Sequence, residues 1–532
     1  MADFDYIIVG AGSAGCVLAN RLSEGGRASV LLLEAGPRDD YLWIHIPIGY
    51  GKTMFHPVYN WRFSSEPDPH MHDRELYQPR GRGLGGSSSI NGLVYIRGQQ
   101  DDYDRWASLG NRGWGWSDVK PYFIKLERNT RGASDYHGAD GPLWCSDITE
   151  PNELMDAIVS GAKELGVPHN DDFNGATQEG VGYFQLFTRN GWRCSSATAY
   201  LKSARRRQNL RVETDAHVTQ ILFDGRRAVG VRYGCDGSER TAQAKREVIV
   251  AAGALQRPQL LQLSGIGPGP LLRRIGIPLV HELPGVGENL HDHLQVRLMY
   301  KVSKPVTTND DLRSLAGRIR IGMKWLLHRR GPLAVGINQA GLFTKIMPGA
   351  RTPDIQFHFS TIPADSAGGA PHPWSGCTFS VCQLRPVSRG RVALKSPDPR
   401  QPPSMIFNYL SHDEDRRCTI AAIRFARKLA RTESLRPYLA EEYRPGAEAS
   451  SDDDLLEFAR EYGQTIFHPA GTCKMGEDNM AVVDERLRVY GIAGLRVVDC
   501  SIMPALVSGN THAPVVMIAE KASDMILADA KG

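Results

Sequence analysis

The stretch that decides the fold is DYIIVGAGSAGCVLANRLSEGGRASVLLLEAG, residues 5–36 of a 532-residue chain. It contains a short apolar run, a glycine-rich turn, a segment with Val17, Leu18 and Leu22 at helical spacing, and a second apolar run. This order predicts a strand, a helix and a second strand, which is the opening unit of a doubly wound α/β sheet.

The glycines of this turn have the spacing of a dinucleotide-binding motif. Gly10 permits a tight turn, Gly12 lets the backbone approach a pyrophosphate at the helix N-terminus, and Gly15 lets the helix pack closely on the strand. Glu34 ends the second strand, where a carboxylate accepts hydrogen bonds from an adenosine ribose. The motif therefore predicts a dinucleotide site, although by itself it allows NAD as well as FAD.

A second cluster of glycines lies in QPRGRGLGGSSSINGLVYIRG, residues 78–98. This segment is too rich in glycine and serine for a helix and too regular for a flexible linker. It indicates a backbone that approaches a flat, polar group.

Length and composition restrict the class of protein. A chain of 532 residues predicts two domains and room for a sizeable buried site. The 63 Lys and Arg residues against 59 Asp and Glu residues give a formal net charge of +4, which argues against nucleic-acid binding. Short basic runs at 205–208 and 328–331 are typical of solvated surfaces. We therefore expect a small, weakly charged substrate.

The cysteines and the start of the chain indicate a reducing compartment. Nine scattered cysteines without a Cys-x-x-Cys pair predict reduced thiols and no metal site. The HDH triplet at 291–293 lacks further ligands at metal spacing, so we interpret it as a structural turn. The N-terminal residues are acidic rather than basic, and no apolar run is long enough for a membrane span. We expect a cytoplasmic protein, with contact to a membrane surface left open.

Several segments together resemble one family. The GAGSAG turn, the GRGLGGSSSIN loop, GALQRPQLLQLSGIG (253–267), PGVGENL (284–290), HPAGTCKMG (468–476) and VVDCSIMP with SGNTHAP (497–514) follow one another as in the glucose/methanol/choline (GMC) flavin oxidoreductases. The resemblance covers essentially the whole chain and points to the choline dehydrogenase-like and alcohol dehydrogenase-like branch. An NAD-dependent dehydrogenase would have no role for the GRGLGGSSSIN loop.

The resemblance implies a non-covalently bound, extended FAD. Its implied contacts are Gly10, Gly12, Ser13, Ala14, Gly15, Glu34, Ala35, Arg82, Gly86, Ser87, Asn91, Gly92, Val94, Val218, Ala252, Gly253, Asp499 and Pro514. The helix that begins near Pro514 would direct its positive end at the flavin.

The expected architecture is α/β, or α+β overall. A Rossmann-like FAD-binding domain takes residues 1–155, 200–305 and 460–532, and a discontinuous substrate-binding domain takes 156–199 and 306–459. In the second domain, PDIQFHFSTIP, CTFSVCQLRPVSRGRVALKS and PSMIFNYL predict strands of an antiparallel sheet. The amphipathic pattern of SHDEDRRCTIAAIRFARKLART predicts a helix that covers this sheet.

Two histidines are the candidate catalytic residues. An alcohol gives up a hydride to a flavin only when its hydroxyl proton is also removed, and neutral histidine suits the role of base. His468 matches the base of the family. The second member of the family's pair is a histidine or an asparagine, and counting back from Lys521 places it at His512. His512 would donate a hydrogen bond to the substrate oxygen.

The expected reaction is oxidation of a primary alcohol to an aldehyde, with proton abstraction at His468 and hydride transfer to flavin N5. The candidate substrate pocket consists of Gln339, Phe357, Ile466 and Phe467, with Val335 and Ile337 beside them. Choline-oxidising relatives tend to hold the trimethylammonium group with a carboxylate where this chain has Gln339, which disfavours choline. We expect a neutral aliphatic or aromatic alcohol or a polyether.

Alternatives remain for the electron acceptor and for the class. We expect a dehydrogenase that passes electrons to a quinone or another carrier, and an oxygen-using oxidase that makes hydrogen peroxide is the alternative. A Rossmann-type binding protein without catalysis is an alternative of another class, and the two histidines argue against it.

The mode of FAD attachment is a testable prediction. Choline-oxidising flavin oxidases can carry a histidine at the position of Ile90 that bonds the flavin covalently, and isoleucine cannot form this bond. We expect acid precipitation to leave the yellow colour in the supernatant. Flavin that stays with the pellet would contradict the prediction.

Overall fold

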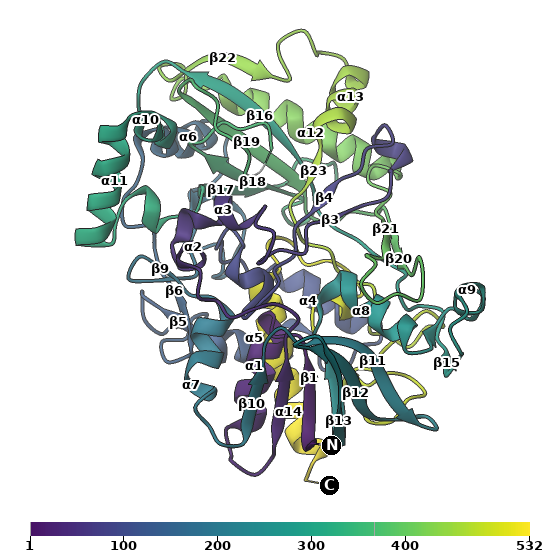
Figure 1. Cartoon of the computed structure of the whole chain (residues 1–532). Helices are drawn as coiled ribbons and strands as arrows, with labels where there is room; N and C mark the ends of the chain where they lie inside the picture. The colour runs from purple at the N-terminus through teal and green to yellow at the C-terminus, as the bar shows by residue number, and fades with distance from the viewer. Residues whose placement is uncertain (1, 367, 532) are drawn as a thin grey trace.

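The computed structural model describes residues 2–366 and 368–531. Within these ranges the chain forms two large sheets, a mixed one in the lower part of Figure 1 and an antiparallel one above it. Shorter strand pairs and helices surround both sheets. The first sheet has the order β10-β2-β1-β13-β12-β11, with β24 paired to β13. Its strands are β1 (Ala2–Val9), β2 (Val30–Leu33), β10 (Leu210–Glu213), β11 (His217–Asp224), β12 (Arg227–Cys235), β13 (Ser238–Val250) and β24 (Leu495–Val497).

The predicted strand, helix, strand unit is confirmed. β1 pairs in parallel with both β2 and β13, and α1 (Ser13–Ser23) connects β1 to β2. All four residues of β2 are buried, as expected for a parallel strand covered on both faces. Helix α1 packs against α14 (His512–Asp529), and the two ends of the chain lie close together at the bottom of Figure 1.

Gly15 is required for this packing. A Cβ atom at this position would lie 1.8 Å from the carbonyl oxygen of Gly10, so no larger residue fits without a backbone shift. The predicted role of Gly15 in close packing of helix on strand thus has a direct steric cause.

The second sheet is antiparallel, as predicted. Its order is β22-β16-β19-β18-β17-β7, with β23 paired to β16. Its strands are β7 (Gly180–Tyr183), β16 (Leu294–Val302), β17 (Asn338–Thr344), β18 (Ile355–Ser360), β19 (Gly376–Gln383), β22 (Leu439–Arg444) and β23 (Gln464–Thr465). Helices α6 (Glu153–Glu164), α12 (Asp413–Ala430) and α13 (Asp452–Tyr462) pack on it.

The predicted helix over the sheet is α12. Its Ile423 and Leu429 are buried, while three acids occupy its first turn and basic residues its last, which suits the helix dipole. The segments 391–393 and 404–406 form strands β20 (Arg391–Ala393) and β21 (Ser404–Ile406), which pair with each other rather than joining the large sheet.

The predicted domain boundaries differ from the sheets at two places. β16 and β23 fall inside the ranges predicted for the FAD-binding domain, but both belong to the second sheet. The reason is that each strand directly adjoins a cofactor-type motif, PGVGENL before β16 and HPAGTCKMG after β23, so the chain passes between the domains within a few residues.

The remaining elements complete the two layers. The other helices are α2 (Leu42–His45), α3 (Tyr50–Thr53), α4 (Gln100–Ser108), α5 (Trp116–Leu126), α7 (Lys202–Ala204), α8 (Gly253–Leu263), α9 (Gly269–Ile275), α10 (Thr308–Arg313) and α11 (Leu315–His328). Single turns lie at η1 (Pro47–Gly49), η2 (Pro69–Met71), η3 (Gly86–Ser89), η4 (Ala197–Leu201), η5 (Pro332–Ala334) and η6 (Cys500–Ile502). Short strand pairs are β3 (Phe63–Ser64) with β4 (Tyr77–Gln78), β5 (Glu127–Asn129) with β6 (Leu143–Cys145), β8 (Thr188–Arg189) with β9 (Trp192–Arg193), and β14 (Ile266–Gly267) with β15 (His281–Glu282).

The prediction of reduced thiols agrees with the structure. All nine cysteines are free thiols in this part of the chain. Within the described ranges, no helix combines the length and apolar character needed to cross a bilayer.

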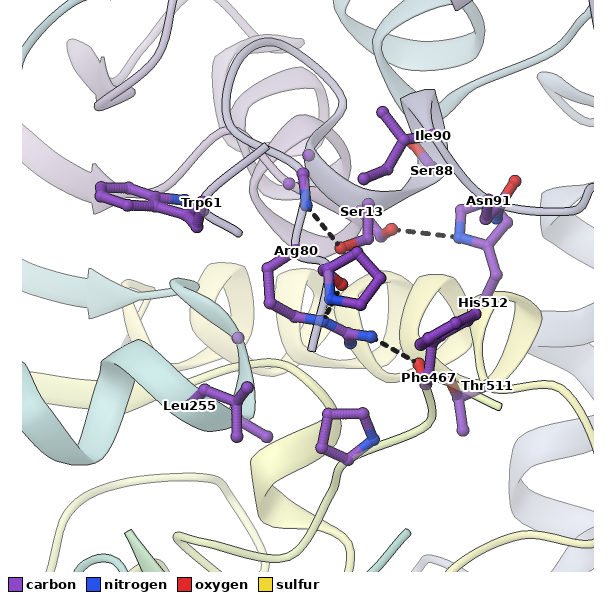
Figure 2. A pocket seen from close by; sticks show the side chains of 18 of the residues that line it. Ser13, Trp61, Arg80, Ser88, Ile90, Asn91, Leu255, Phe467, Thr511 and His512 are labelled. Atoms are coloured by element: carbon purple, nitrogen blue, oxygen red, sulfur yellow. Dashed lines mark hydrogen bonds between the residues drawn. The ribbon is translucent and has the colours of Figure 1, made fainter. Parts of the chain in front are cut away.

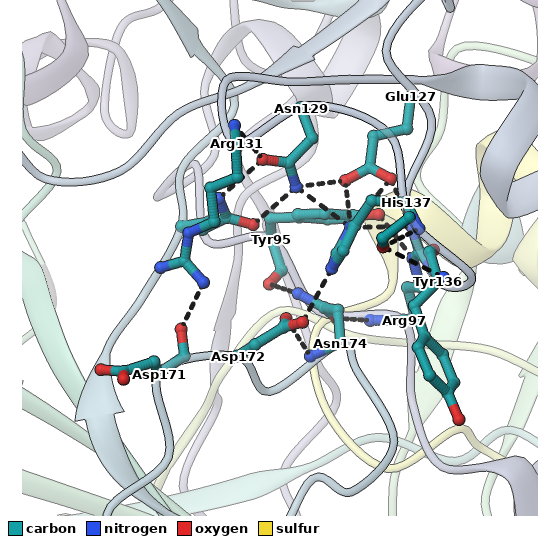
Figure 3. A network of polar contacts seen from close by, with 12 residues as sticks. Tyr95, Arg97, Glu127, Asn129, Arg131, Tyr136, His137, Asp171, Asp172 and Asn174 are labelled. Atoms are coloured by element: carbon teal, nitrogen blue, oxygen red, sulfur yellow. Dashed lines mark hydrogen bonds and ion pairs between the residues drawn. The ribbon is translucent and has the colours of Figure 1, made fainter.

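A buried polar network fixes the loops between α4 and β7 (Figure 3). His137 lies at its centre, with Nδ1 2.9 Å from Oε1 of Glu127 and Nε2 2.8 Å from Oδ2 of Asp172. Arg97 forms an ion pair with the same Glu127. Burial alone would lower the pKa of His137, but hydrogen bonds to Asp172 and Glu127 raise this pKa to about 9. The ring is therefore an imidazolium between two carboxylates.

His137 should make the stability of the protein depend on pH. Its folded pKa of about 9 exceeds its ordinary value of 6.5, so the folded chain keeps a proton that the unfolded chain loses. This stabilisation is complete below pH 6.5 and is lost as the pH rises through 9. We expect urea unfolding to show a loss of about 3 kcal/mol across this window. Replacement His137→Gln should flatten the slope, and an equal slope in both proteins would contradict the assignment.

Candidate active site

A cavity of about 310 Å³ lies between the two sheets. The C-terminal ends of β1, β2 and β13 open into it at Gly10, Glu34 and Ala251, which is where ligands bind in open α/β sheets. The second sheet contributes polar residues from its strands, among them Asn338 and His358. One end of the cavity thus belongs to the glycine loops and the other to the antiparallel sheet.

Most residues predicted to contact FAD line this cavity. They are Gly10, Gly12, Ser13, Ala14, Glu34, Ala35, Gly86, Ser87, Asn91, Gly92, Val94, Val218, Ala252, Gly253 and Asp499. Gly15, Arg82 and Pro514 do not line it. Gly15 lies under the turn, and Pro514 is buried in the first turn of α14. Arg82 donates to the carbonyl oxygen of Ala35 and stacks over Trp61, 5.2 Å from the ring centre.

Glu34 connects the two glycine loops. Its Oε2 accepts a hydrogen bond from the backbone N–H of Ala11 at 2.8 Å, and its Oε1 accepts from the N–H groups of Gly36 and Gly83 at 2.9 Å. Burial raises the pKa of this carboxyl, and the three backbone donors oppose that shift. The carboxylate therefore holds the walls of the cofactor half in place as well as facing the cavity.

The cofactor half fits an extended dinucleotide. A Cβ at Gly86 would lie 2.7 Å from Cα of Gly12, so the two glycine loops touch. A Cβ at Gly253 would meet nothing within 4 Å, and its φ of +80° suits glycine. Gly253 thus presents bare backbone to open space, as a pyrophosphate site requires. Nε2 of His512 is buried without a partner among the described residues, which leaves a polar atom for a ligand.

A chain of hydrogen bonds fixes the ring of His468. Nε2 of His293 lies 2.9 Å from the carbonyl oxygen of Leu384 and must donate to it, so Nδ1 of His293 is an acceptor. Nδ1 of His468 lies 3.0 Å from that atom and must therefore carry the proton. Nε2 of His468 is left as an acceptor, and Nδ2 of Asn510 donates to it at 3.3 Å.

The backbone of His468 is held as firmly as its ring. Its N–H donates to Oδ1 of Asp292 at 2.7 Å, while the other oxygen of Asp292 accepts from Tyr409 Oη at 2.6 Å and from Thr465. The preceding Phe467 has a φ of +71°, and Arg80 donates to its carbonyl oxygen at 2.9 Å (Figure 2). These bonds keep a strained turn in place and aim the imidazole into the cavity.

The histidines of the site are neutral. Burial, with the neighbouring His293, lowers the pKa of His468 well below its usual value. Burial likewise lowers the pKa of His293 to about 4 and that of His358 to about 4. A neutral His468 with a free lone pair on Nε2 can accept a proton at pH 7.

The structure places Asn510, rather than His512, against His468. Nδ1 of His512 lies 3.0 Å from Oγ of Ser13 in the first glycine loop (Figure 2). The His512 ring packs edge-on against Phe187. Burial, with the charge of Arg193, lowers the pKa of His512 to about 3. Counting back from Lys521 predicts His512 and not Asn510, although Asn510 lies in the same SGNTHAP motif and the family's pair admits asparagine.

The candidate substrate pocket is only partly as predicted. Ile466, Phe467 and Ile337 line the cavity, whereas Gln339, Phe357 and Val335 do not. Strand alternation is the reason, because His358 on β18 faces the cavity while Phe357 points to the other face and contacts Phe425 of α12. On β17 the same alternation presents Asn338 to the cavity and turns Gln339 away.

The charges at the two ends of the cavity differ. Among the described residues that line it, the carboxylates are Glu34 and Asp499, both at the glycine-loop end. Asp499 pairs with Arg257 and accepts from the N–H of Ser501 at 2.8 Å. The end near His468 carries Arg80 and Arg297. This end offers no described carboxylate to a cationic substrate.

Comparisons with known proteins agree with this geometry. A family model described as GMC oxidoreductase matches residues 4–295, and a second with the same description matches residues 386–519. Oxygen-dependent choline dehydrogenase of Ectopseudomonas mendocina (strain ymp) is 46% identical over 534 residues, covering 98% of this chain and 94% of the relative. The protein of the same name from Yersinia pseudotuberculosis serotype O:1b (strain IP 31758) is 45% identical with the same coverage.

Two solved structures share the whole fold. Pyridoxine 4-oxidase from Mesorbium loti superimposes with a TM-score of 0.89 at 30% identity, covering 98% of both chains. A variant of formate oxidase from Aspergillus oryzae RIB40 reaches a TM-score of 0.93 at 27% identity, covering 100% of this chain and 99% of that chain. The chain therefore belongs to the GMC oxidoreductase family of FAD-dependent enzymes that act on CH–OH groups.

Proposed function

We propose that this protein oxidises a neutral primary alcohol to the aldehyde, with Nε2 of His468 accepting the hydroxyl proton. The observation that supports this best is the hydrogen-bond chain from Leu384 through His293, which leaves Nε2 of His468 as an acceptor in the cavity. An alcohol releases a hydride readily only when its hydroxyl proton is removed as well. FAD, when bound, supplies the acceptor for that hydride.

Asn510 would position the substrate oxygen, and His293 would position the ring of His468. The N–H of Asn510 that points at Nε2 can turn to the substrate oxygen and stabilise the negative charge that develops there. His293 would keep the His468 ring in one orientation and one tautomer, since its own proton is committed to Leu384. Burial of His468 and His293 would limit access of competing water.

The charges that line the cavity near His468 favour a neutral substrate. A trimethylammonium group would meet Arg80 and Arg297 at this end of the cavity, without a carboxylate among the described lining residues. Ile466, Phe467 and Ile337 offer an apolar surface, so we propose an aliphatic or aromatic alcohol. Because the chain is 46% identical to a choline dehydrogenase, choline should be compared directly with neutral alcohols as a substrate.

We propose a quinone or another carrier as the electron acceptor. Oxygen is the second candidate, because the two solved relatives are named as oxidases and the curated relatives as oxygen-dependent. Anaerobic reduction followed by admission of air separates the two, since an oxidase recovers its yellow colour rapidly.

The experiment that tests the function is reduction of the bound flavin by alcohols. We expect His468→Ala to slow the bleaching of flavin absorbance by about 100- to 10,000-fold in anaerobic stopped flow, because the base is lost. His169→Ala, a surface histidine, is the control and should reduce at the parent rate. Reduction of His468→Ala at the parent rate would refute the base. A parent protein that binds FAD but is bleached by no alcohol would favour the non-catalytic alternative.

A second comparison decides which residue is the partner of His468. We expect Asn510→Ala to slow flavin reduction by about 100-fold with full flavin content, because one donor to the reacting oxygen is removed. His512→Ala should chiefly lower flavin content, since His512 contacts Ser13 in the first glycine loop. The opposite pattern, slow reduction in His512→Ala with flavin retained and normal reduction in Asn510→Ala, would restore His512 as the partner.

A further inference from the structure

Helix α11 stands away from the rest of the molecule. In Figure 1 it lies at the outer edge, beside α10 and far from the first sheet. Its buried residues are Gly317, Ile321 and Trp325, one turn apart on a single narrow face. Trp325 anchors that face, because its Nε1 donates to the carbonyl oxygen of Gly191 at 2.9 Å. Most of the helix surface therefore faces outward.

The outward surface of α11 is apolar. Leu315, Ile319, Met323, Leu326 and Leu327 are 74%, 57%, 46%, 56% and 65% exposed. At about 100° per residue these side chains cover an arc of about 120° on the side opposite the buried face. Five large apolar side chains on one exposed helix are more than the scattered apolar residues of an ordinary surface, and such a patch marks an interaction site.

Basic residues border this apolar arc. Arg318 lies on one side of it and Arg320 and Lys324 lie on the other, and all three are exposed. Between residues 315 and 331 there are five arginine or lysine residues and no acid. Two of the charges have partners from elsewhere, since Arg320 pairs with Asp311 and Lys324 pairs with Glu150 at 2.7 Å. Arg318, whose Nε donates to the carbonyl oxygen of Leu312, keeps its charge unpaired by any described acid.

We propose that α11 docks the protein on an anionic lipid surface. An apolar arc bordered by Lys and Arg is the pattern of a helix that lies in the membrane interface, with its apolar side chains among the acyl chains and its cations among the phosphates. A second copy of this chain fits less well, because a symmetric contact would bring the basic borders of two α11 helices together. A helix that lies in the membrane interface binds the lipid surface without a segment that crosses the bilayer.

The docked face lies beside segments that line the cavity. α11 leads through η5 to Ile337 and Asn338, which line the cavity. The turn η1 packs against η5, and α3 next to it supplies Tyr50 to the same cavity. A membrane-dissolved carrier would therefore reach this end of the cavity with little exposure to water. This consequence rests on the proposed function, whereas the docking itself does not.

Vesicle binding tests the proposal without turnover. The FAD-loaded, full-length protein is sedimented with vesicles of phosphatidylcholine alone or mixed with phosphatidylglycerol. We expect binding to the mixed vesicles that weakens with added salt, and at least about tenfold weaker binding for the double variant Ile319→Gln, Leu326→Gln. Arg318→Gln should weaken binding to the mixed vesicles only.

Matched controls keep the test specific. Leu109→Gln and Leu279→Gln remove exposed apolar side chains elsewhere, at 49% and 42% exposure, and should bind as the parent does. Flavin reduction by alcohol should be equal in all variants, which separates failed docking from failed catalysis. Absence of parent binding to the mixed vesicles, or undiminished binding of the double variant, would overturn the proposal. So would a dimer in sedimentation velocity that the double variant abolishes, because the apolar arc would then cover a second copy.

Discussion

The contacts of Asp292 and His293 are the constraint on which the site depends. These two residues lie where the chain leaves the first domain and enters β16, and between them they bond Tyr409, Thr465, Leu384 and His468. Segments far apart in the sequence are thereby fixed against the two residues that precede β16. The Asp292 carboxylate holds the backbone of His468, and the His293 ring sets the proton on its side chain. Loss of either residue would leave buried polar groups unpaired, which costs about 1–3 kcal/mol each.

In the cofactor half of the cavity, a single buried carboxylate likewise holds separate segments together. Glu34 accepts backbone hydrogen bonds from Ala11, Gly36 and Gly83, and so joins the first glycine turn to the second glycine cluster. The same loops touch at Gly12 and Gly86, where a side chain would collide with backbone. One carboxylate and a few glycines thus determine how closely two loops, separated by about seventy residues of sequence, face a shared ligand. The catalytic half and the cofactor half each depend on one buried acid near a strand end.

Sequence reasoning recovered the elements whose signals are local. The glycine turn, the helix over 413–430 and the cavity position of His468 followed from spacing, from periodicity or from the family resemblance. Which face of a strand meets the cavity did not follow, because every residue of β18 is buried and the apolar pattern is the same on both sides. Phe357 was therefore assigned to the wrong face. Asn510 was missed for a related reason, since counting residues from Lys521 says nothing about which side chain turns toward His468. The HDH triplet was interpreted as a structural turn, and only the long-range contact with His468 reveals that His293 orients the candidate base.

The charges around His468 affect how readily this residue can accept a proton. Burial keeps His468, His293 and His358 neutral, and Arg80 and Arg297 already place positive charge at this end of the cavity. A proton accepted by His468 adds a further positive charge that burial disfavours, so transfer becomes favourable only as negative charge develops nearby. In the proposed mechanism, removal of the hydroxyl proton would therefore be coupled to oxidation of the alcohol. Under this proposal, a neutral, buried His468 held between Asp292 and the cavity would accept a proton only as the alcohol is oxidised.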